Sequence, residues 1–372
     1  MQKRKSEITL FSLLMCVLVI FIHVTSWTLT AMDRTSVKYL LLLFPWRLSA
    51  FVVQGFVFLS GVRLFLSAKP FDYGRFLRGR IRRIVFPYLA WVAIYYACFI
   101  AIGWYRFSFR DLAEYVFLGT LCSHFYFVVI ILQFYLLMPL WRWLLDRVDA
   151  RLLCGAAILV TAAFKLFVHF RYDDRVFPAY LCWFLLGAAV GRHYDAVVAK
   201  LKAHLSLLGT AFLVTAAADL YFTWRSQCFG EVFPWFEALH LVYAMAAIFF
   251  CFAAFAKACE KLDALPAFFA LCDRSSYLIY RACSADLCGK PSNPAHRRYD
   301  HGNGVSVPFR LHLCRDLRRL SLLYICERKN QGATATCQRT HKSGPRLTRS
   351  GRISLPHMNA SAVPPPSCGT AR

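Results

Sequence analysis

The chain has 372 residues, of which 58% are hydrophobic and 16% aromatic, and its mean hydropathy is +0.46. This composition excludes an ordinary water-soluble protein and predicts a chain that crosses a membrane many times. The net charge of +24 would indicate a nucleic-acid partner in a soluble protein. Here the cations lie in loops and in a C-terminal tail, so we expect the lipid bilayer, and no nucleic acid, as the partner.

The first apolar run, residues 8–27, reads ITLFSLLMCVLVIFIHVTSW and carries one ionisable residue, His23. Twenty helical residues rise roughly 30 Å, the thickness of the hydrocarbon core of a bilayer, so the run predicts a membrane helix. An imidazole in such a helix needs a partner, a wet cavity or a chemical role, because an unpaired charge in lipid is costly. An interfacial position near Trp27 is the alternative interpretation.

Further apolar runs follow in the remainder of the chain, separated by polar or basic segments. We expect spans over residues 46–67, 84–104, 124–145, 152–170, 176–194, 205–222 and 237–256, and a last one beginning near Leu265. Residues 105–122 form an amphipathic segment. The predicted fold is therefore an all-α, polytopic transmembrane helix bundle of about nine spans.

Lys and Arg residues are distributed unevenly between the two sides of this bundle. With the N-terminus in the cytoplasm, inner segments hold seventeen of them and outer segments hold eight. The positive-inside rule then favours a multi-pass protein of the cell membrane, a bacterial plasma or inner membrane, with a cytoplasmic N-terminus. His23 would lie toward the external leaflet, opposite the densest cationic cluster.

The last quarter of the chain differs in composition from the rest. Residues 281–372 contain one Phe, no Trp, 16 Lys or Arg and four Asp or Glu, a net charge of 16 − 4 = +12. We expect residues 1–280 to form the transmembrane domain and residues 281–372 a disordered basic tail. We favour a shifted reading frame as the origin of this tail, and an inactive chain is one alternative. The string of Cys283, Cys288, His296 and His301 has the wrong spacing for a zinc finger, so we expect no metal site.

A basic run precedes the third span and places Arg75, Arg78 and Arg82 at near-helical spacing on one face. Guanidinium groups match phosphate oxygens in geometry and charge, so this face could hold a nucleotide phosphate such as that of coenzyme A. A cytoplasmic loop that obeys the positive-inside rule and attracts anionic lipids is the alternative.

Five strings, in order, resemble the acyltransferase 3 family of integral-membrane O-acyltransferases that act on cell-surface glycans. They are LLMCVLVIFIHV with His23, GFVFLSGVRLF with Ser60 and Gly61, RGRIRRIVFPYLAW with Arg82, Arg83 and Pro87, SHFYFVVIILQFYLLMPLW with His124, Tyr126, Tyr135 and Pro139, and SSYLIY at 275–280. The resemblance covers residues 5–280. It implies ten spans, of which the tenth is missing, and a second histidine in the ninth span, where Cys283 stands.

The resemblance implies transfer of an acyl group, commonly acetyl, from acyl-CoA to a hydroxyl of an extracytoplasmic polysaccharide or glycolipid. His23 would be the catalytic base, and His124 or Tyr126 would stabilise the oxyanion. The substrate-binding residues would be Arg75, Arg78, Arg82, Arg83 and Ser60. Acyl-CoA is a co-substrate, and no bound cofactor is expected.

Relatives often carry a basic residue eleven positions before the first-helix histidine, where this chain has Ser12. Arg63 or Lys165, within other spans, could supply that cation instead. From the residues alone, a transporter or flippase for a glycan or lipid-linked precursor remains an alternative, because transporters also place polar residues inside spans.

Overall fold

The computed structural model describes residues 5–67 and 70–262, and these contain helices and no strand. All of them belong to the first of two compact units, residues 1–306. The ninth predicted span, near Leu265, and the predicted tail at 281–372 lie outside the described residues. The all-helical prediction is therefore confirmed for the part of the chain that carries the candidate site.

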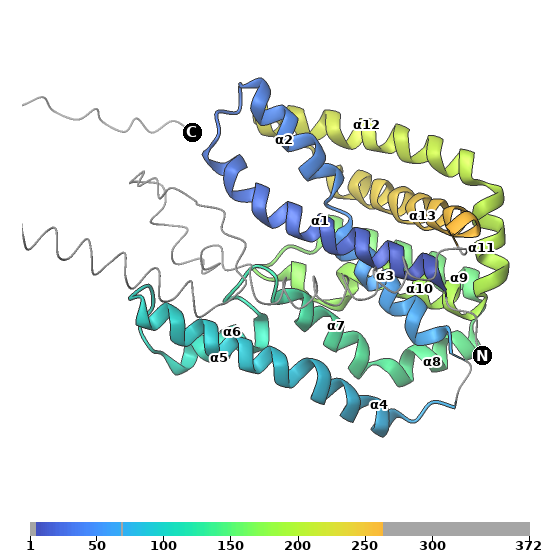
Figure 1. Ribbon diagram of the computed structural model, residues 1–372, viewed down its shortest axis with the longest axis horizontal. Helices are drawn as coiled ribbons and strands as arrows, with labels where there is room; N and C mark the ends of the chain where they lie inside the picture. The colour runs from blue at the N-terminus through green and yellow to red at the C-terminus, as the bar shows by residue number, and fades with distance from the viewer. Residues whose placement is uncertain (1–4, 68–69, 263–372) are drawn as a thin grey trace, which may run out of the picture. The chain divides into compact units, whose positions relative to one another are not determined.

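Thirteen α-helices follow one another in the described residues (Figure 1). They are α1 (Ser6–Ala31), α2 (Val37–Leu48), α3 (Val52–Phe65), α4 (Tyr73–Arg80), α5 (Phe86–Ala101), α6 (Phe109–Leu118), α7 (Tyr126–Leu136), α8 (Met138–Arg147), α9 (Ala150–Phe167), α10 (Leu181–Arg192), α11 (Tyr194–Ala203), α12 (Leu205–Phe229) and α13 (Phe236–Leu262). A π-helical turn (Ile81–Val85) joins α4 to α5, and 3-10 turns at Asp173–Arg175 and Phe177–Tyr180 precede α10.

Six helical segments of the described residues are long and apolar enough to cross a membrane, or seven if the bent pair α7 and α8 is one span. Each of the first eight predicted spans overlaps one of these segments or the shorter apolar helix Phe177–Arg192. The sixth predicted span coincides with that shorter helix, and the ninth lies outside the described residues. The second span was also placed too late, since α2 begins at Val37.

The fourth predicted span is broken rather than straight. The axes of α7 and α8 differ by 55°, and the break lies at Leu137, two residues before Pro139. Proline cannot donate the backbone hydrogen bond that a continuous helix needs, and its ring displaces the preceding carbonyl. The bend therefore follows directly from the sequence.

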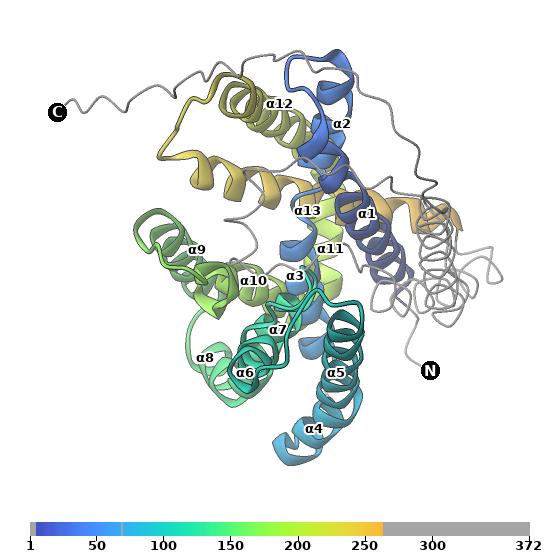
Figure 2. The ribbon, with the colours of Figure 1, turned by 90° about the vertical axis from the view of Figure 1, so that its left-hand side faces the viewer.

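Helices α3 and α10 form the centre of the main hydrophobic core, with α1 on the other side of α3 (Figure 2). Glycines allow the two backbones to touch. A Cβ atom at Gly61 would lie 2.3 Å from the Phe184 carbonyl oxygen, and one at Gly187 would lie 2.1 Å from that of Phe58. Small residues at such positions are typical of helix packing in membranes, where close backbone contact replaces the hydrophobic effect.

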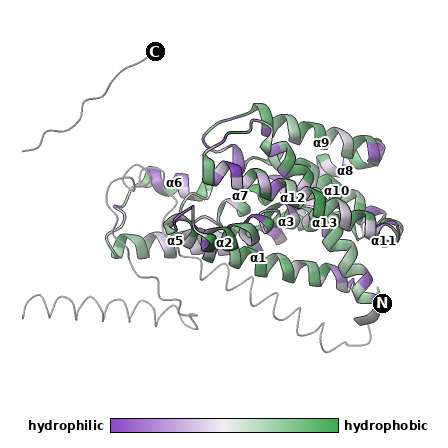
Figure 3. Cartoon of the chain, turned by 90° about the horizontal axis from the view of Figure 1, so that it is seen from above, coloured by the Kyte–Doolittle hydropathy of each residue, from purple (hydrophilic) through white to green (hydrophobic). Residues whose placement is uncertain are grey.

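The outer faces of the bundle are apolar, as expected for helices surrounded by lipid. Only 11% of the most apolar stretch of α9, and the same share of α12, is buried inside the protein. Leu152, Leu159, Leu213 and Phe229 are among the exposed apolar side chains of these two helices. Apolar residues, green in Figure 3, predominate along α9 and α1. A bilayer would cover this surface.

Candidate active site

His23 lies on α1, and its half-buried ring faces a turn from a distant part of the chain. Its Nδ1 atom lies 3.3 Å from Oγ of Ser123, which is 100 residues away in sequence. A hydroxyl both donates and accepts, so Ser123 suits either tautomer of the imidazole. The ring therefore has a polar neighbour from the bundle, as a functional interpretation of His23 requires.

The turn that carries Ser123 connects α6 to α7 and is tightly folded. Gly119 ends α6 with a φ of +62°, a conformation that residues with a Cβ atom rarely adopt. A Cβ atom there would also lie 2.8 Å from the Phe125 carbonyl carbon. Buried Leu121 and Cys122 anchor the middle of the turn. The sequence thus fixes the loop that brings Ser123 to His23.

His124 is the second histidine of the site. Its ring centroid lies 6.2 Å from that of His23, and the two rings meet edge to face. Both ring nitrogens of His124 are buried and have no hydrogen-bond partner in the described part of the chain. Burial and the nearby His23 lower the pKa of His124 to about 4, so its imidazole is neutral near pH 7. Buried polar atoms normally find partners, so the unpaired nitrogens of His124 make it a candidate functional residue.

Tyr126 is less well placed for the same chemistry. It begins α7, packs against the main core, and has Asp174 and Arg175 as its charged neighbours. None of its described contacts is to His23. Of the two residues expected to stabilise an oxyanion, the structure brings His124, and not Tyr126, into contact with His23.

The predicted phosphate-binding arginines lie on α4 and the π-helical turn. Arg75, Arg78, Arg82 and Arg83 are all exposed, and Arg78 and Arg82 line an open groove together with Leu77, Ile81 and Phe86. The π-helical turn was not predicted. In it the Phe86 amide donates to the carbonyl of Ile81, five residues earlier, immediately before Pro87, which cannot donate.

Ser60 lies half-buried on α3, where its hydroxyl donates to the Phe56 carbonyl at 2.9 Å. Arg63, one turn later on the same helix, reaches α1. Its Nη2 atom donates to Ser12 Oγ at 2.5 Å. Lys165 instead lies 3.4 Å from Glu237 and takes no part in this contact.

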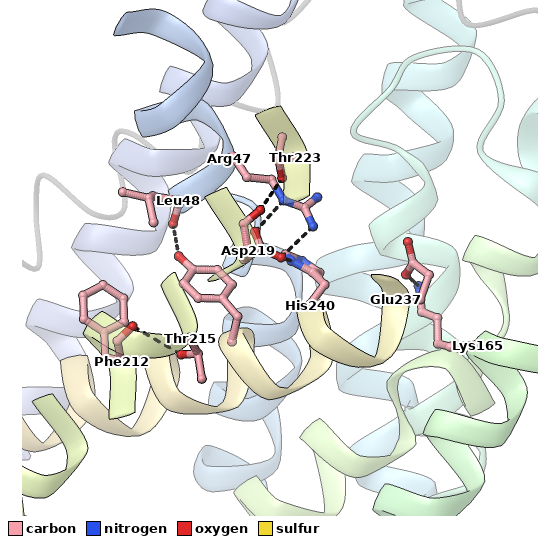
Figure 4. Close-up of polar contacts among 10 residues, drawn as sticks. Arg47, Leu48, Lys165, Phe212, Thr215, Asp219, Thr223, Glu237 and His240 are labelled. Carbon is pink, nitrogen blue, oxygen red and sulfur yellow. Dashed lines mark hydrogen bonds and ion pairs between the residues drawn. The ribbon is translucent and has the colours of Figure 1, made fainter. Parts of the chain in front are cut away.

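A second polar cluster joins α2, α12 and α13 (Figure 4). Arg47 donates two hydrogen bonds to the Asp219 carboxylate, at 2.6 and 2.9 Å, and His240 Nδ1 donates to it at 3.2 Å. The Asp219 side chain is fully buried. His240 is itself buried in this cluster. Periodicity could not reveal a contact between residues 172 positions apart.

Within the described residues, no three His, Cys, Asp or Glu side chains are grouped so as to hold a metal ion.

A family model described as an acyltransferase domain, acyltransferase 3, matches residues 7–281. The chain belongs to the acyltransferase 3 family. Comparisons with curated proteins and with solved structures gave no match. The family and the apolar helices together identify a membrane acyltransferase.

Proposed function

We propose that this membrane acyltransferase moves an acyl group, most simply acetyl, from acyl-CoA to a hydroxyl of an extracytoplasmic polysaccharide or glycolipid. The N-terminus lies in the cytoplasm of a bacterial cell, and His23 lies toward the outer surface. The observation that carries the proposal is the pairing of His23 with Ser123 and His124 inside an acyltransferase 3 domain.

His23 acts as the general base. In its neutral form it takes the proton from the acceptor hydroxyl as the hydroxyl oxygen attacks the carbonyl carbon of the thioester. The carbon–sulfur bond then breaks, and the CoA thiolate receives the proton from His23. Ser123 holds Nδ1, which leaves Nε2 for the acceptor.

The tetrahedral intermediate carries a negative oxygen that needs a hydrogen-bond donor. His124 is the better candidate, because its nitrogens are buried, lack partners and lie beside His23. A donor in such a place acts strongly, since few competing dipoles surround it. Tyr126 is the second candidate. Arg75, Arg78, Arg82 and Arg83, with Ser60, form the proposed route by which the anionic donor approaches.

Transfer of label from acetyl-CoA tests the proposal. Membranes that contain the full chain are incubated with acetyl-labelled acetyl-CoA, and label is counted in the polysaccharide and glycolipid fractions. We expect label in one of them, and none with membranes that lack the chain. A transporter or flippase would move glycan without acquiring label, and a chain made inactive by a shifted frame after residue 280 would give none. Either result would contradict the proposed activity.

A further inference from the structure

The turn that connects α6 to α7 is held by side chains from other parts of the chain. The hydroxyl of Tyr88, on α5, lies within hydrogen-bond distance of two carbonyls in the last turn of α6, at 2.9 and 2.8 Å. Arg175, in the α9–α10 connection (residues 168–180), donates through Nη1 to the carbonyl of Leu118, the last residue of α6. Carbonyls at the end of an α-helix lack partners within the helix, and a cation beside them also offsets the negative end of the helix dipole. The end of α6 is therefore fixed where the turn begins.

The α9–α10 connection also contacts α7, the helix on the other side of the turn. The side-chain amide of Gln133, on α7, forms two hydrogen bonds with it: Nε2 donates to the carbonyl of Arg175 at 2.7 Å, and Oε1 accepts from the amide of Phe177 at 2.9 Å. The hydroxyl of Tyr172 donates to Glu114 of α6 at 2.7 Å. One segment thus bonds to both of the helices that the turn connects.

The guanidinium group of Arg175 is itself held in place. Only 14% of the side chain is exposed, and its Nε atom lies 3.4 Å from the carboxylate of Asp174. Its Cζ atom lies 4.9 Å from the ring centroid of Tyr172. Both partners belong to the same connection. A guanidinium that is restrained on several sides holds its carbonyl acceptor more firmly than a mobile surface arginine would.

The α9–α10 connection is anchored to the core of the bundle. The hydroxyl of Tyr180 donates to the backbone carbonyl of Asp174 at 3.1 Å, and buried Thr161 of α9 donates to the carbonyl of Pro178 at 3.1 Å. Helix α10 begins directly after the connection and packs against α3, which in turn packs against α1, the helix of His23 (Figure 2). The turn and His23 are therefore positioned by the same group of packed helices.

The geometry beside His23 depends on where this turn lies. Ser123 Oγ is 3.3 Å from Nδ1 of His23, near the upper limit for a hydrogen bond, so a shift of the turn by less than about 1 Å would break the contact. Misplacement of a catalytic group by about 1 Å can lower the rate of a reaction about 100-fold. A residue that holds the turn can therefore affect the rate without touching the substrate.

We propose that Arg175 is a positioning residue for acyl transfer: by bonding Leu118 where the turn begins, it keeps Ser123 beside His23. Gln133 assists by fixing the backbone of Arg175. This inference rests on the proposed function, because it assigns the orientation of the base in that reaction. Arg175 acts through the turn and does not take part in the chemistry itself.

Amide hydrogen exchange of the full chain in detergent tests whether Arg175 holds the turn, and it needs no turnover. Arg175→Gln should speed exchange in peptides that cover residues 119–125 about tenfold, because a charge-assisted hydrogen bond is lost. Peptides from α3 and α10 should exchange as they do in the unmodified chain. Arg110→Gln, at an exposed arginine near the start of α6, is the control and should change neither region.

Steady-state kinetics with acetyl-CoA test whether this restraint matters for the reaction. Arg175→Gln should lower kcat about tenfold and leave KM for acetyl-CoA unchanged, since none of the described contacts of Arg175 is to the proposed donor-binding arginines. Ser123→Ala should lower kcat to a similar extent. The double variant should be no slower than the slower single variant, because both substitutions remove the same contact. Arg175→Lys, which keeps the charge, should recover part of kcat.

The inference is wrong if exchange in the turn is unchanged in Arg175→Gln, or if α3 and α10 also exchange faster, which would mean a general loss of packing. It is also wrong if the losses of kcat multiply in the double variant. If the unmodified chain transfers label and Arg175→Gln transfers it with the same kcat, the inference fails and the proposed function stands. If the unmodified chain transfers no label, the proposed function fails, whereas faster exchange in Arg175→Gln would still show that Arg175 holds the turn.

Discussion

Two histidine clusters in the same bundle differ in how their polar atoms are satisfied. His240 donates to a fully buried Asp219 that Arg47 also binds, so charge and hydrogen bonds are balanced within the protein. His23 and His124 have no carboxylate partner in the described residues, and both nitrogens of His124 lack a hydrogen bond. A satisfied cluster holds helices together, whereas unpaired buried polar atoms mark a candidate functional site.

Of the substitutions that test this comparison, loss of His23 should have the largest effect on the rate of transfer. His23→Ala should lower the rate of transfer by about 10²- to 10⁴-fold, the usual contribution of a general base. Label from acetyl-CoA in the glycan fraction measures the rate. His204→Ala, at an exposed histidine between α11 and α12, is the control and should transfer normally. Normal transfer by folded His23→Ala would exclude the residue as the base.

Removal of Asp219 should affect stability and leave chemistry unchanged. Asp219→Ala leaves Arg47 and His240 buried without their acceptor, which should destabilise the protein by about 3–5 kcal/mol. Thermal unfolding in detergent measures the loss, and transfer per folded molecule should stay constant. If the folded variant no longer transfers label, the Asp219 cluster takes part in the reaction, and the proposed difference between the two histidine clusters is wrong.

A smaller effect is expected from a substitution in the turn beside His23. In Gly119→Ala the left-handed backbone costs about 1–2 kcal/mol, and the new Cβ atom collides with Phe125. Ser123 and His124 should shift, so kcat should fall while the bundle remains folded. Gly103→Ala is the matched control, because its φ is +81° but a Cβ atom there meets nothing within 4 Å. Equal kcat values in the two variants would show that the turn does not position the site.

The weakest expected effect is a dependence of stability on pH. The pKa of His124 is about 4 in the folded chain and 6.5 ordinarily, so unfolding favours proton uptake between these values. Stability from the neutral ring is complete above about pH 6.5 and is lost as the pH falls through about 4. His124→Asn does not titrate and should reduce this dependence in thermal unfolding measured from pH 4 to 7. An unchanged pH profile would contradict the burial of a neutral His124.

Local patterns in the sequence predicted the membrane helices and the residue at the centre of the site. The length of each apolar run predicted a membrane span, because each helix must cross the same thickness of lipid. Ser123 was missed, since its contact with His23 depends on a turn 100 residues away. The pairing of Asp219 with Arg47 was missed for the same reason. Arg63 and Lys165 were both named as possible cations, and the sequence could not show that Arg63 contacts Ser12 whereas Lys165 pairs with Glu237.

The contact between α3 and α10 has a mechanical consequence. Two helices whose backbones touch at Gly61 and Gly187 have no side-chain layer between them that could yield. We therefore expect α3 and α10 to keep their relative position during a reaction cycle. Helix α4 contacts Tyr135 through the long side chain of Arg80, which can change its rotamer, so we expect this side of the bundle to move more readily.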